Sequence, residues 1–305
     1  MFTGNANPRR TFESMERSET AERLGLSVPY EWWPAAPMLK EFEAAGFGWI
    51  QIPSPPDSVL IDPRAASKHA VATRAALDVT ALKTMVHAPG ALRAGSSATA
   101  DRVLEGVISY AADIGAPLVV YHAANVPDDR AGEDAIEAET RALTAIAGLA
   151  EQLGVTIALE NLAPVFPGVE ALSFTPRVVR SMAKRIGSPA VGVCLDIGHA
   201  HLVASLRSTD VIDLIAPALD EAVAFHVHDN FGSRRTAGPR PDLDPIRLDL
   251  HLPPGRGTAP WHRIAPMLRR TEAPLLLEVH PPRQAPSRLH AEARNVLFPK
   301  AVAAA

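Results

Sequence analysis

Residues 191–201 read VGVCLDIGHAH, an apolar run that ends in Asp196 and is followed closely by His199. Five other apolar runs also end in a side chain that can bind a divalent metal ion. They are TMVH (84–87), LVVYH (118–122), VTIALE (155–160), AVAFH (222–226) and PLLLE (274–278). The carboxyl ends of the strands of a parallel barrel converge on one mouth, where active sites are built. The pattern therefore indicates a metal-assisted enzyme.

Short apolar runs alternate with helical segments from about residue 24 onward. The candidate strands are 24–28, 47–53, 84–88, 117–123, 155–161, 191–197, 222–228 and 274–280. Runs this apolar are typical of parallel strands that are buried on both faces. Eight strands alternating with helices predict an α/β protein, a single (β/α)8 TIM barrel. A doubly wound open sheet is the alternative, but it would not gather six strand ends around one point.

The segments between the strands have apolar residues three or four positions apart, and several of them stop at glycine, as helices do. Thr175 followed by Pro176 predicts a helix start, with threonine as the N-cap. Two connections, 162–174 and 229–259, are longer than packing requires. Long loops after strands lie on the mouth side of a barrel, so we expect both to cover a substrate there.

Length and composition limit the classes of protein. A chain of 305 residues suits one barrel, which we place at residues 21–300, between a polar segment at 1–20 and a tail at 301–305. The net charge of −4 makes a nucleic acid an unlikely partner. No run approaches the roughly 18 apolar residues of a membrane span, and the polar N-terminus does not resemble a signal peptide. We therefore expect a cytoplasmic protein. Cys194 lies within an apolar run, so a buried core residue is favoured over a thiolate ligand.

Four strand ends carry three carboxylates and one imidazole: Glu160, Asp196, His226 and Glu278. Such a set suits Mn²⁺, Mg²⁺, Co²⁺ or Zn²⁺. A single buried acid at a strand end often only caps a neighbouring helix. All four together predict a metal site, because buried carboxylates without partners are costly.

A second set of candidate ligands consists of His87, His122, His199, Asp249 and His251. The D-x-H spacing of the last two puts both side chains on one side of an extended segment. These five residues either complete further metal sites, giving more than one ion per chain, or line the pocket and hydrogen-bond substrate hydroxyls. The residues alone leave both interpretations open.

The strings ALEN (158–161), CLDIGHAHL (194–202), HVHDN (226–230), DLHLPPGRG (249–257) and LLLEVH (275–280) resemble the xylose isomerase-like TIM barrel superfamily. That superfamily includes sugar phosphate isomerases and epimerases and the endonuclease IV group. Its single-metal enzymes imply that Glu160, Asp196, His226 and Glu278 bind the metal. They further imply that Glu160 and Glu278 are the acid–base pair, and that His199 contacts the substrate oxygen beside the reacting carbon.

The resemblance to the endonuclease IV group implies nine zinc ligands, and each has a counterpart here. They are His87, His122, Glu160, Asp196, His199, His226, Asp249, His251 and Glu278. Two departures stand out. Arg256 occupies the glutamate position of the D-x-H-x-x-x-G-E-G pattern, and HVHDN replaces H-x-N-D.

The sequence therefore predicts a metal-dependent isomerase or epimerase that acts on a sugar, a cyclitol or a related polyhydroxy carbonyl compound through an enediolate. The alternatives are a trinuclear-zinc phosphodiesterase acting on abasic DNA, a related metal-dependent lyase, and a metal-binding barrel without catalysis. Relatives of this kind are often dimers or tetramers, so the resemblance also implies a homo-oligomer.

Substrate contacts are expected from the loops around the mouth. Arg234, Arg235, Arg240 and Arg247 form either a solvated loop or a clamp for a phosphate or carboxylate. Trp32, Trp33 and Trp261 either pack or form a pocket wall for a sugar face. His228 and His280 are expected to line the pocket further out, and His69, His262 and His290 to be helical surface residues.

Overall fold

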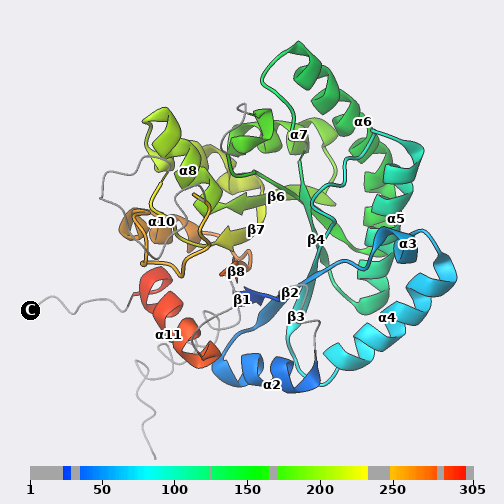
Figure 1. Ribbon diagram of the computed structural model, residues 1–305, viewed down its shortest axis with the longest axis horizontal. Coiled ribbons are helices and arrows are strands. Elements are labelled where there is room, and N and C mark those ends of the chain that lie inside the picture. Colours follow the sequence, from blue (N-terminus) through cyan, green and yellow to red (C-terminus); the bar gives the residue numbers. More distant parts are fainter. Residues whose placement is uncertain are drawn as a thin grey trace, which may run out of the picture.

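Eight parallel strands form a closed barrel in the computed structural model, with β8 pairing back onto β1 (Figure 1). The structure describes residues 23–28, 35–123, 125–164, 171–232, 248–279 and 285–299. The strands are β1 (Leu24–Ser27), β2 (Trp49–Pro53), β3 (Lys83–His87), β4 (Leu118–His122), β5 (Thr156–Glu160), β6 (Val191–Asp196), β7 (Ala222–Val227) and β8 (Leu275–Leu277). The predicted barrel is confirmed, and the alternative of an open sheet is wrong.

Helices surround the barrel, as the periodic segments predict (Figure 1). They are α2 (Ala36–Ala45), α3 (Asp57–Leu60), α4 (Pro63–Leu77), α5 (Ala98–Ile114), α6 (Arg130–Leu153), α7 (Pro176–Ile186), α8 (Ile197–Arg207), α9 (Val211–Ile215), α10 (Trp261–Leu268) and α11 (Pro286–Leu297), with short 3₁₀ turns η2 (Leu172–Phe174) and η3 (Ala216–Glu221). Helices α2, α5, α6 and α7 end at glycines with φ between 66° and 100°. A side chain would strain this left-handed conformation, so glycine fixes these ends.

The inner face of the barrel is plugged by an apolar layer just below the mouth. Met85, Val120, Ala158, Cys194, Ala224 and Leu276 pack together there, fully buried. Each of them lies two residues before one of the six predicted strand-end ligands. Because side chains alternate between the two faces of a strand, the six ligands form the next inward layer. Cys194 is confirmed as a buried core residue, and burial raises the pKa of its thiol to about 12.

Three sequence predictions need correction. Thr175 does precede α7, but its hydroxyl donates to the carbonyl of Leu172, 3.4 Å away, instead of capping the helix. His290 is buried, because it lies on the α11 face that packs against Phe47 and α2. His69 is half-buried, with its Nδ1 3.0 Å from the Tyr110 hydroxyl.

Several predictions concern residues outside the described part of the chain. These are the terminal segments 1–20 and 301–305, the arginines Arg234, Arg235, Arg240 and Arg247, the tryptophans Trp32 and Trp33, and His280. Of the two long connections, 165–170 and 233–247 lie outside it too. Among the residues that are described, no helix has the length and apolar character needed to cross a membrane.

Candidate metal centre

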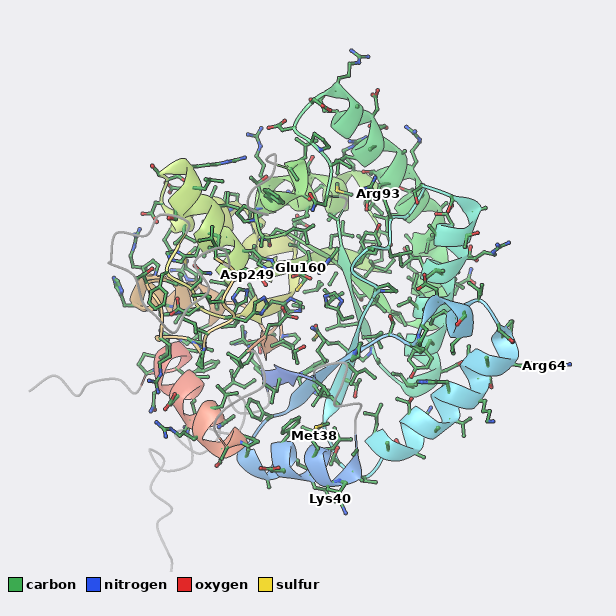
Figure 2. The ribbon with its side chains drawn as sticks, viewed as in Figure 1. Met38, Lys40, Arg64, Arg93, Glu160 and Asp249 are labelled. Atoms are coloured by element: carbon green, nitrogen blue, oxygen red, sulfur yellow. The ribbon has the colours of Figure 1, made fainter. Side chains whose placement is uncertain are left out.

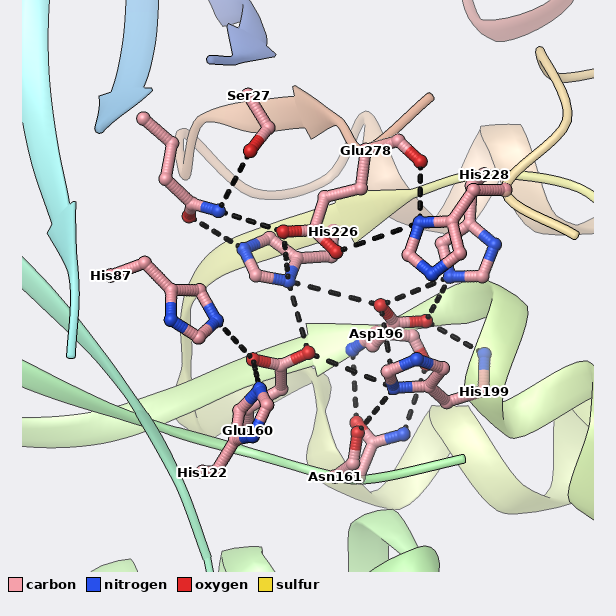
Figure 3. A network of polar contacts seen from close by, with 12 residues as sticks. Ser27, His87, His122, Glu160, Asn161, Asp196, His199, His226, His228 and Glu278 are labelled. Carbon is pink, nitrogen blue, oxygen red and sulfur yellow. Dashed lines mark hydrogen bonds and ion pairs between the residues drawn. The ribbon is translucent and has the colours of Figure 1, made fainter. Parts of the chain in front are cut away.

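Glu160, Asp196, His226 and Glu278 meet at the mouth of the barrel, from the ends of β5, β6, β7 and β8 (Figure 3). Each offers a donor atom, and these atoms all lie within 4.8 Å of one another. Nδ1 of His226 lies 3.0 Å from Glu160 Oε1, 3.5 Å from Glu278 Oε1 and 3.8 Å from Asp196 Oδ2. We name these four residues the central group. Figure 2 shows Glu160 near the barrel axis, whereas Lys40 and Arg64 point outward from α2 and α4.

A second set of donors shares Glu160. Oε2 of Glu160 lies 3.5 Å from His87 Nε2 and 3.3 Å from His122 Nε2. Neither contact completes a hydrogen bond, although this oxygen is buried. Donor atoms that converge on a buried carboxylate oxygen without a hydrogen bond to it fit a shared cation. We name His87, His122 and Glu160 the second group.

A third set lies on the other side of the centre and contains His199, His228, Asp249 and His251. Asp249 Oδ2 is 3.4 Å from His199 Nε2 and 2.9 Å from His251 Nε2. His228 Nδ1 lies 3.7 Å from Asp249 Oδ1. We name these four residues the third group. His228, expected to line the pocket for substrate, therefore lies among the candidate ligands.

Backbone carbonyls set the orientation of three imidazoles. Nδ1 of His87 donates to the carbonyl of Ala88 (2.7 Å), and Nδ1 of His251 donates to that of Glu278 (2.7 Å). Nδ1 of His199 likewise donates to the Asn161 carbonyl at 2.9 Å. A carbonyl only accepts, so each Nδ1 carries the hydrogen, and each Nε2 is directed at a carboxylate of its group. In metal sites, a hydrogen bond of this kind usually fixes the tautomer and the ring orientation of the histidine ligand.

Asp196 combines a capping role with a place in the central group. Its Oδ1 accepts from the backbone N–H of His199 at 2.7 Å and so caps α8. Its Oδ2 faces His226 and His228. Asn161 fixes the backbone here, because its side-chain amide donates to the Asp196 carbonyl and accepts from the Asp196 N–H. The helix cap therefore orients the second oxygen toward the centre.

Ionised carboxylates and protonated imidazoles balance each other in this cluster. Burial alone would raise the pKa of Glu160, but the charges of His226 and His122 hold it well below its usual range. Burial would lower the pKa of His199, but Asp196 and Asp249 raise it well above the ordinary value. The pKa of His226 is raised in the same way, against burial, by Cys194, Glu278 and Glu160. A divalent cation can replace these protons, so the donor set fits a metal.

Hydrogen bonds to the buried Asp229 hold the later part of the loop after β7 at the mouth of the barrel. One of its carboxylate oxygens accepts from the N–H of Gly255 and the indole of Trp261, and the other from the N–H of Ala259. Trp261 is therefore buried and fixes the loop instead of lining a pocket. A backbone pair between Asp229 and Leu252 holds the segment that carries Asp249 and His251.

The predicted convergence of Asp249 and His251 occurs, but an extended segment is not its cause. His251 has a φ of 47°, in the left-handed region. Its ring therefore turns back onto Asp249, and the Glu278 carbonyl holds it there. Arg256, which occupies the glutamate position of the endonuclease pattern, pairs with the exposed face of α11 through both oxygens of Glu292.

Sequence reasoning missed Gln51, which is buried in β2. Its amide nitrogen donates to Glu278 Oε1 (2.7 Å) and Ser27 Oγ (3.3 Å). Because a carboxylate fixes this amide orientation, Gln51 Oε1 accepts from His226 Nε2 at 2.7 Å. His226 is thereby left with Nδ1 as its metal-binding atom. The signal was available, since Gln51 is a polar residue between two apolar ones in WIQIP.

Replacing Gln51 with leucine should weaken metal binding by about 10- to 100-fold, the usual effect of losing an outer partner of a ligand. The variant leaves His226 Nε2 without its acceptor and Glu278 without its donor. Competition against a chelating dye measures the affinity. Ser27→Ala, which removes only the 3.3 Å contact to Gln51, is the control and should bind metal as the wild type does. A folded Gln51→Leu protein with unchanged affinity would contradict this role.

The family model described as "Xylose isomerase-like TIM barrel" matches residues 39–298. The chain is 32% identical over 153 residues to the "Probable endonuclease 4" of Mycobacterium leprae (strain Br4923), a match that covers 46% of this chain and 58% of that protein. The corresponding protein of Mycobacterium ulcerans (strain Agy99) is 27% identical over 209 residues, covering 67% and 75%. The chain thus spans little more than half the length of the first relative.

Solved structures share the fold at lower identity. A D-tagatose 3-epimerase-like protein has a TM-score of 0.65 and 19% identity, covering 90% of this chain and 95% of that chain. The IOLI protein with a bound zinc atom has a TM-score of 0.65 and 15% identity, covering 90% and 98%. A Thermus thermophilus protein soaked with zinc chloride has a TM-score of 0.61 and 22% identity, covering 90% and 97%. At these identities the comparisons describe the fold alone.

Proposed function

We propose that this chain, which belongs to the xylose isomerase-like TIM barrel family, is a divalent-metal-dependent isomerase or epimerase of a small polyhydroxy carbonyl compound. One observation carries the proposal. The carboxylate of Glu278 belongs to the central group and also borders a cavity of about 410 Å³. That volume lies within the roughly 300–1,000 Å³ of small-molecule sites. A charged base beside a substrate-sized cavity and a cation site is what proton abstraction next to a carbonyl requires.

The cavity lining suits a polyol. Ser27, Gln51, Ser54 and His87 line it together with Glu278. The hydroxyls of Ser27 and Ser54 can both donate and accept hydrogen bonds, so they match the hydroxyls of a sugar or cyclitol. Pro53, Pro55, Pro56 and Pro89 supply apolar surface for the C–H faces of the same molecule.

Glu278 and Glu160 are assigned as the acid–base pair. Burial alone would raise the pKa of Glu278, but the positive charge of His226 lowers it, so the carboxylate is ionised and ready to accept a proton. A divalent ion held by the central group would polarise the carbonyl and the neighbouring hydroxyl, and so acidify the C–H bond between base and carbonyl. Figure 3 shows Glu278 and Glu160 approaching His226 from different sides.

Glu278 takes the proton from the carbon beside the carbonyl, and the C–H electron pair forms the enediolate of the substrate. Isomerisation returns this proton to the former carbonyl carbon, while the proton of the neighbouring hydroxyl passes to the former carbonyl oxygen. Epimerisation instead requires a proton taken up from water by Glu160 and delivered to the opposite face of the same carbon, after which Glu278 gives its proton to water. His199 directs its Nε2 at Asp249 Oδ2 in the third group, so it is assigned a place among the metal ligands and no substrate contact. The D-tagatose 3-epimerase-like protein and a D-psicose 3-epimerase with the same fold favour sugars as the first substrates to test.

We expect the zinc-, manganese- or cobalt-loaded protein to incorporate deuterium from D₂O next to the carbonyl of a sugar. The panel is D-fructose, D-psicose, D-tagatose and a cyclic hydroxy ketone, and the readout is proton NMR. Exchange should require the metal and disappear after chelation. Loss of water from the hydroxy ketone instead of exchange would assign a lyase. No exchange with any member, combined with incision of an abasic oligonucleotide, would overturn the proposal.

The second candidate is an endonuclease IV-like phosphodiesterase. It is favoured by the meeting of all nine predicted ligand residues in the three groups, and by the mycobacterial relatives named probable endonuclease 4. An abasic oligonucleotide containing a single site is the discriminating substrate. Incision faster than any sugar exchange would make this candidate the function.

A further inference from the structure

We propose that His228 is a metal ligand that completes the third group, so that a bound ion there is surrounded by four protein donors and takes no part in the reaction. This inference goes beyond the proposed function, because it concerns an ion away from the Glu278 cavity. It also differs from the sequence prediction, which places His228 in the pocket lining and outside the nine candidate ligands.

The position of His228 follows from strand periodicity. It lies two residues after His226 and therefore on the same side of the strand, one layer further from the apolar layer inside the barrel. The residue is fully buried. A buried imidazole needs a use for both ring nitrogens, since an unmatched polar atom is costly inside a protein.

Only one of the two nitrogens has a hydrogen-bonding partner among the described residues. Nε2 of His228 lies 3.2 Å from Asp196 Oδ2 and donates to that carboxylate. Nδ1 is buried without a hydrogen bond in the described part of the chain and faces Asp249 Oδ1 at 3.7 Å. With its hydrogen on Nε2, the ring directs a lone pair at a carboxylate oxygen. Two acceptors facing each other are stabilised by a cation between them.

The ring is held in this orientation before any ion arrives. It stacks on His251, with ring centroids 4.1 Å apart and planes 5° from parallel. On the other side lies Gly198, where a Cβ atom would come within 2.1 Å of the ring. Glycine at 198 therefore makes room for His228 beside His199. A preorganised ligand loses little entropy when it binds a metal.

Four donors change the chemistry of the site. Three imidazoles and one carboxylate suit tetrahedral Zn²⁺, and a structural zinc site is closed by four protein ligands, whereas a catalytic site keeps one position open. A closed third group would hold together the loop carrying Asp249 and His251, the end of β7 and the start of α8. Its ion would have no position left for a substrate phosphate, which also weighs against the phosphodiesterase.

The test counts metal ions and leaves turnover aside. Wild type, His228→Asn and the control His262→Asn, an exposed helical histidine, are stripped with a chelator, loaded with Zn²⁺ and desalted. Elemental analysis should find one ion fewer per chain in His228→Asn than in the other two. With Co²⁺, the strong visible absorption of a tetrahedral site should be lost in the same variant. Unchanged metal content and absorption in a folded His228→Asn protein would overturn the proposal.

Two further variants separate ligation from other roles. Gly198→Ala keeps a histidine at position 228, but the added Cβ displaces its ring. This variant should therefore also bind one ion fewer per chain. His251→Asn removes an independent member of the third group. In that background, adding His228→Asn should change zinc content and affinity no further. A further loss would mean that His228 acts by orienting Asp196 in the central group, and the proposal would be wrong. Because the readout is metal content, failure of the isomerase assay would not affect this result.

Discussion

Replacing Glu278 with glutamine is expected to lower kcat by about 10²- to 10⁴-fold, the usual contribution of a positioned acid–base group. Glutamine keeps the size of the side chain and an oxygen that can bind a metal, but it cannot accept the substrate proton. Glu278 is the member of the central group that borders the cavity, and 14% of its side chain is exposed, against 1% for Glu160. Deuterium exchange into the sugar, measured beside metal content, tests the prediction.

Ser54→Ala is the control, because Ser54 lines the same cavity as Glu278 but does not belong to the central group. Loss of this hydroxyl should raise KM, while kcat stays within a few-fold of wild type. A Glu278→Gln protein that keeps its metal and full exchange would remove Glu278 from the acid–base role. To separate loss of the metal from loss of the base, the Glu278→Gln protein is assayed after saturating Mn²⁺ has been restored.

The fold and much of the site could be predicted because both depend on local periodicity. A strand alternates its faces, so an apolar residue two positions before a histidine or an acid marks the barrel interior. Met85 precedes His87 in this way, and Ala158 precedes Glu160. Parallel closure then brings the strand ends together without any knowledge of individual contacts. The same rule could have located Gln51, but glutamine is not a typical metal ligand.

Contacts between distant loops could not be predicted in the same way. Asp229 resembles an ordinary loop acid in the sequence, yet its carboxylate anchors a segment about thirty residues further along, including Ala259 and Trp261. The place of His228 depends on Gly198, and that of His251 on a left-handed backbone. Such features arise from tertiary packing, so a residue's own neighbourhood in the sequence carries little information about them.

Metal loading should raise Tm by on the order of 10 °C at pH 8, and by much less at pH 6. An ion at about 1,000 times its Kd contributes about 4 kcal/mol to the free energy of unfolding, and each kcal/mol raises Tm by about 2–4 °C for proteins of 150–250 residues. The dependence on pH follows from the raised pKa values of His199 and His226. Their protonated forms stabilise the metal-free fold fully below pH about 6.5, and this contribution is lost as the pH rises through the raised values.

The carboxylates act in the opposite sense at lower pH. The pKa values of Glu160 and Asp196 are lowered, so their contribution is present above about pH 4 and is lost as the pH falls through the lowered values. As the pH rises through the raised histidine pKa values, the buried carboxylates of the metal-free cluster lose their imidazolium partners, and a divalent ion restores the balance. Calorimetric scans of stripped and loaded protein from pH 5.5 to 8.5 measure the difference. Asp196→Asn, which removes one carboxylate from the central group, should show a smaller gain at every pH. A gain that is independent of pH would mean that the ion does not displace these protons.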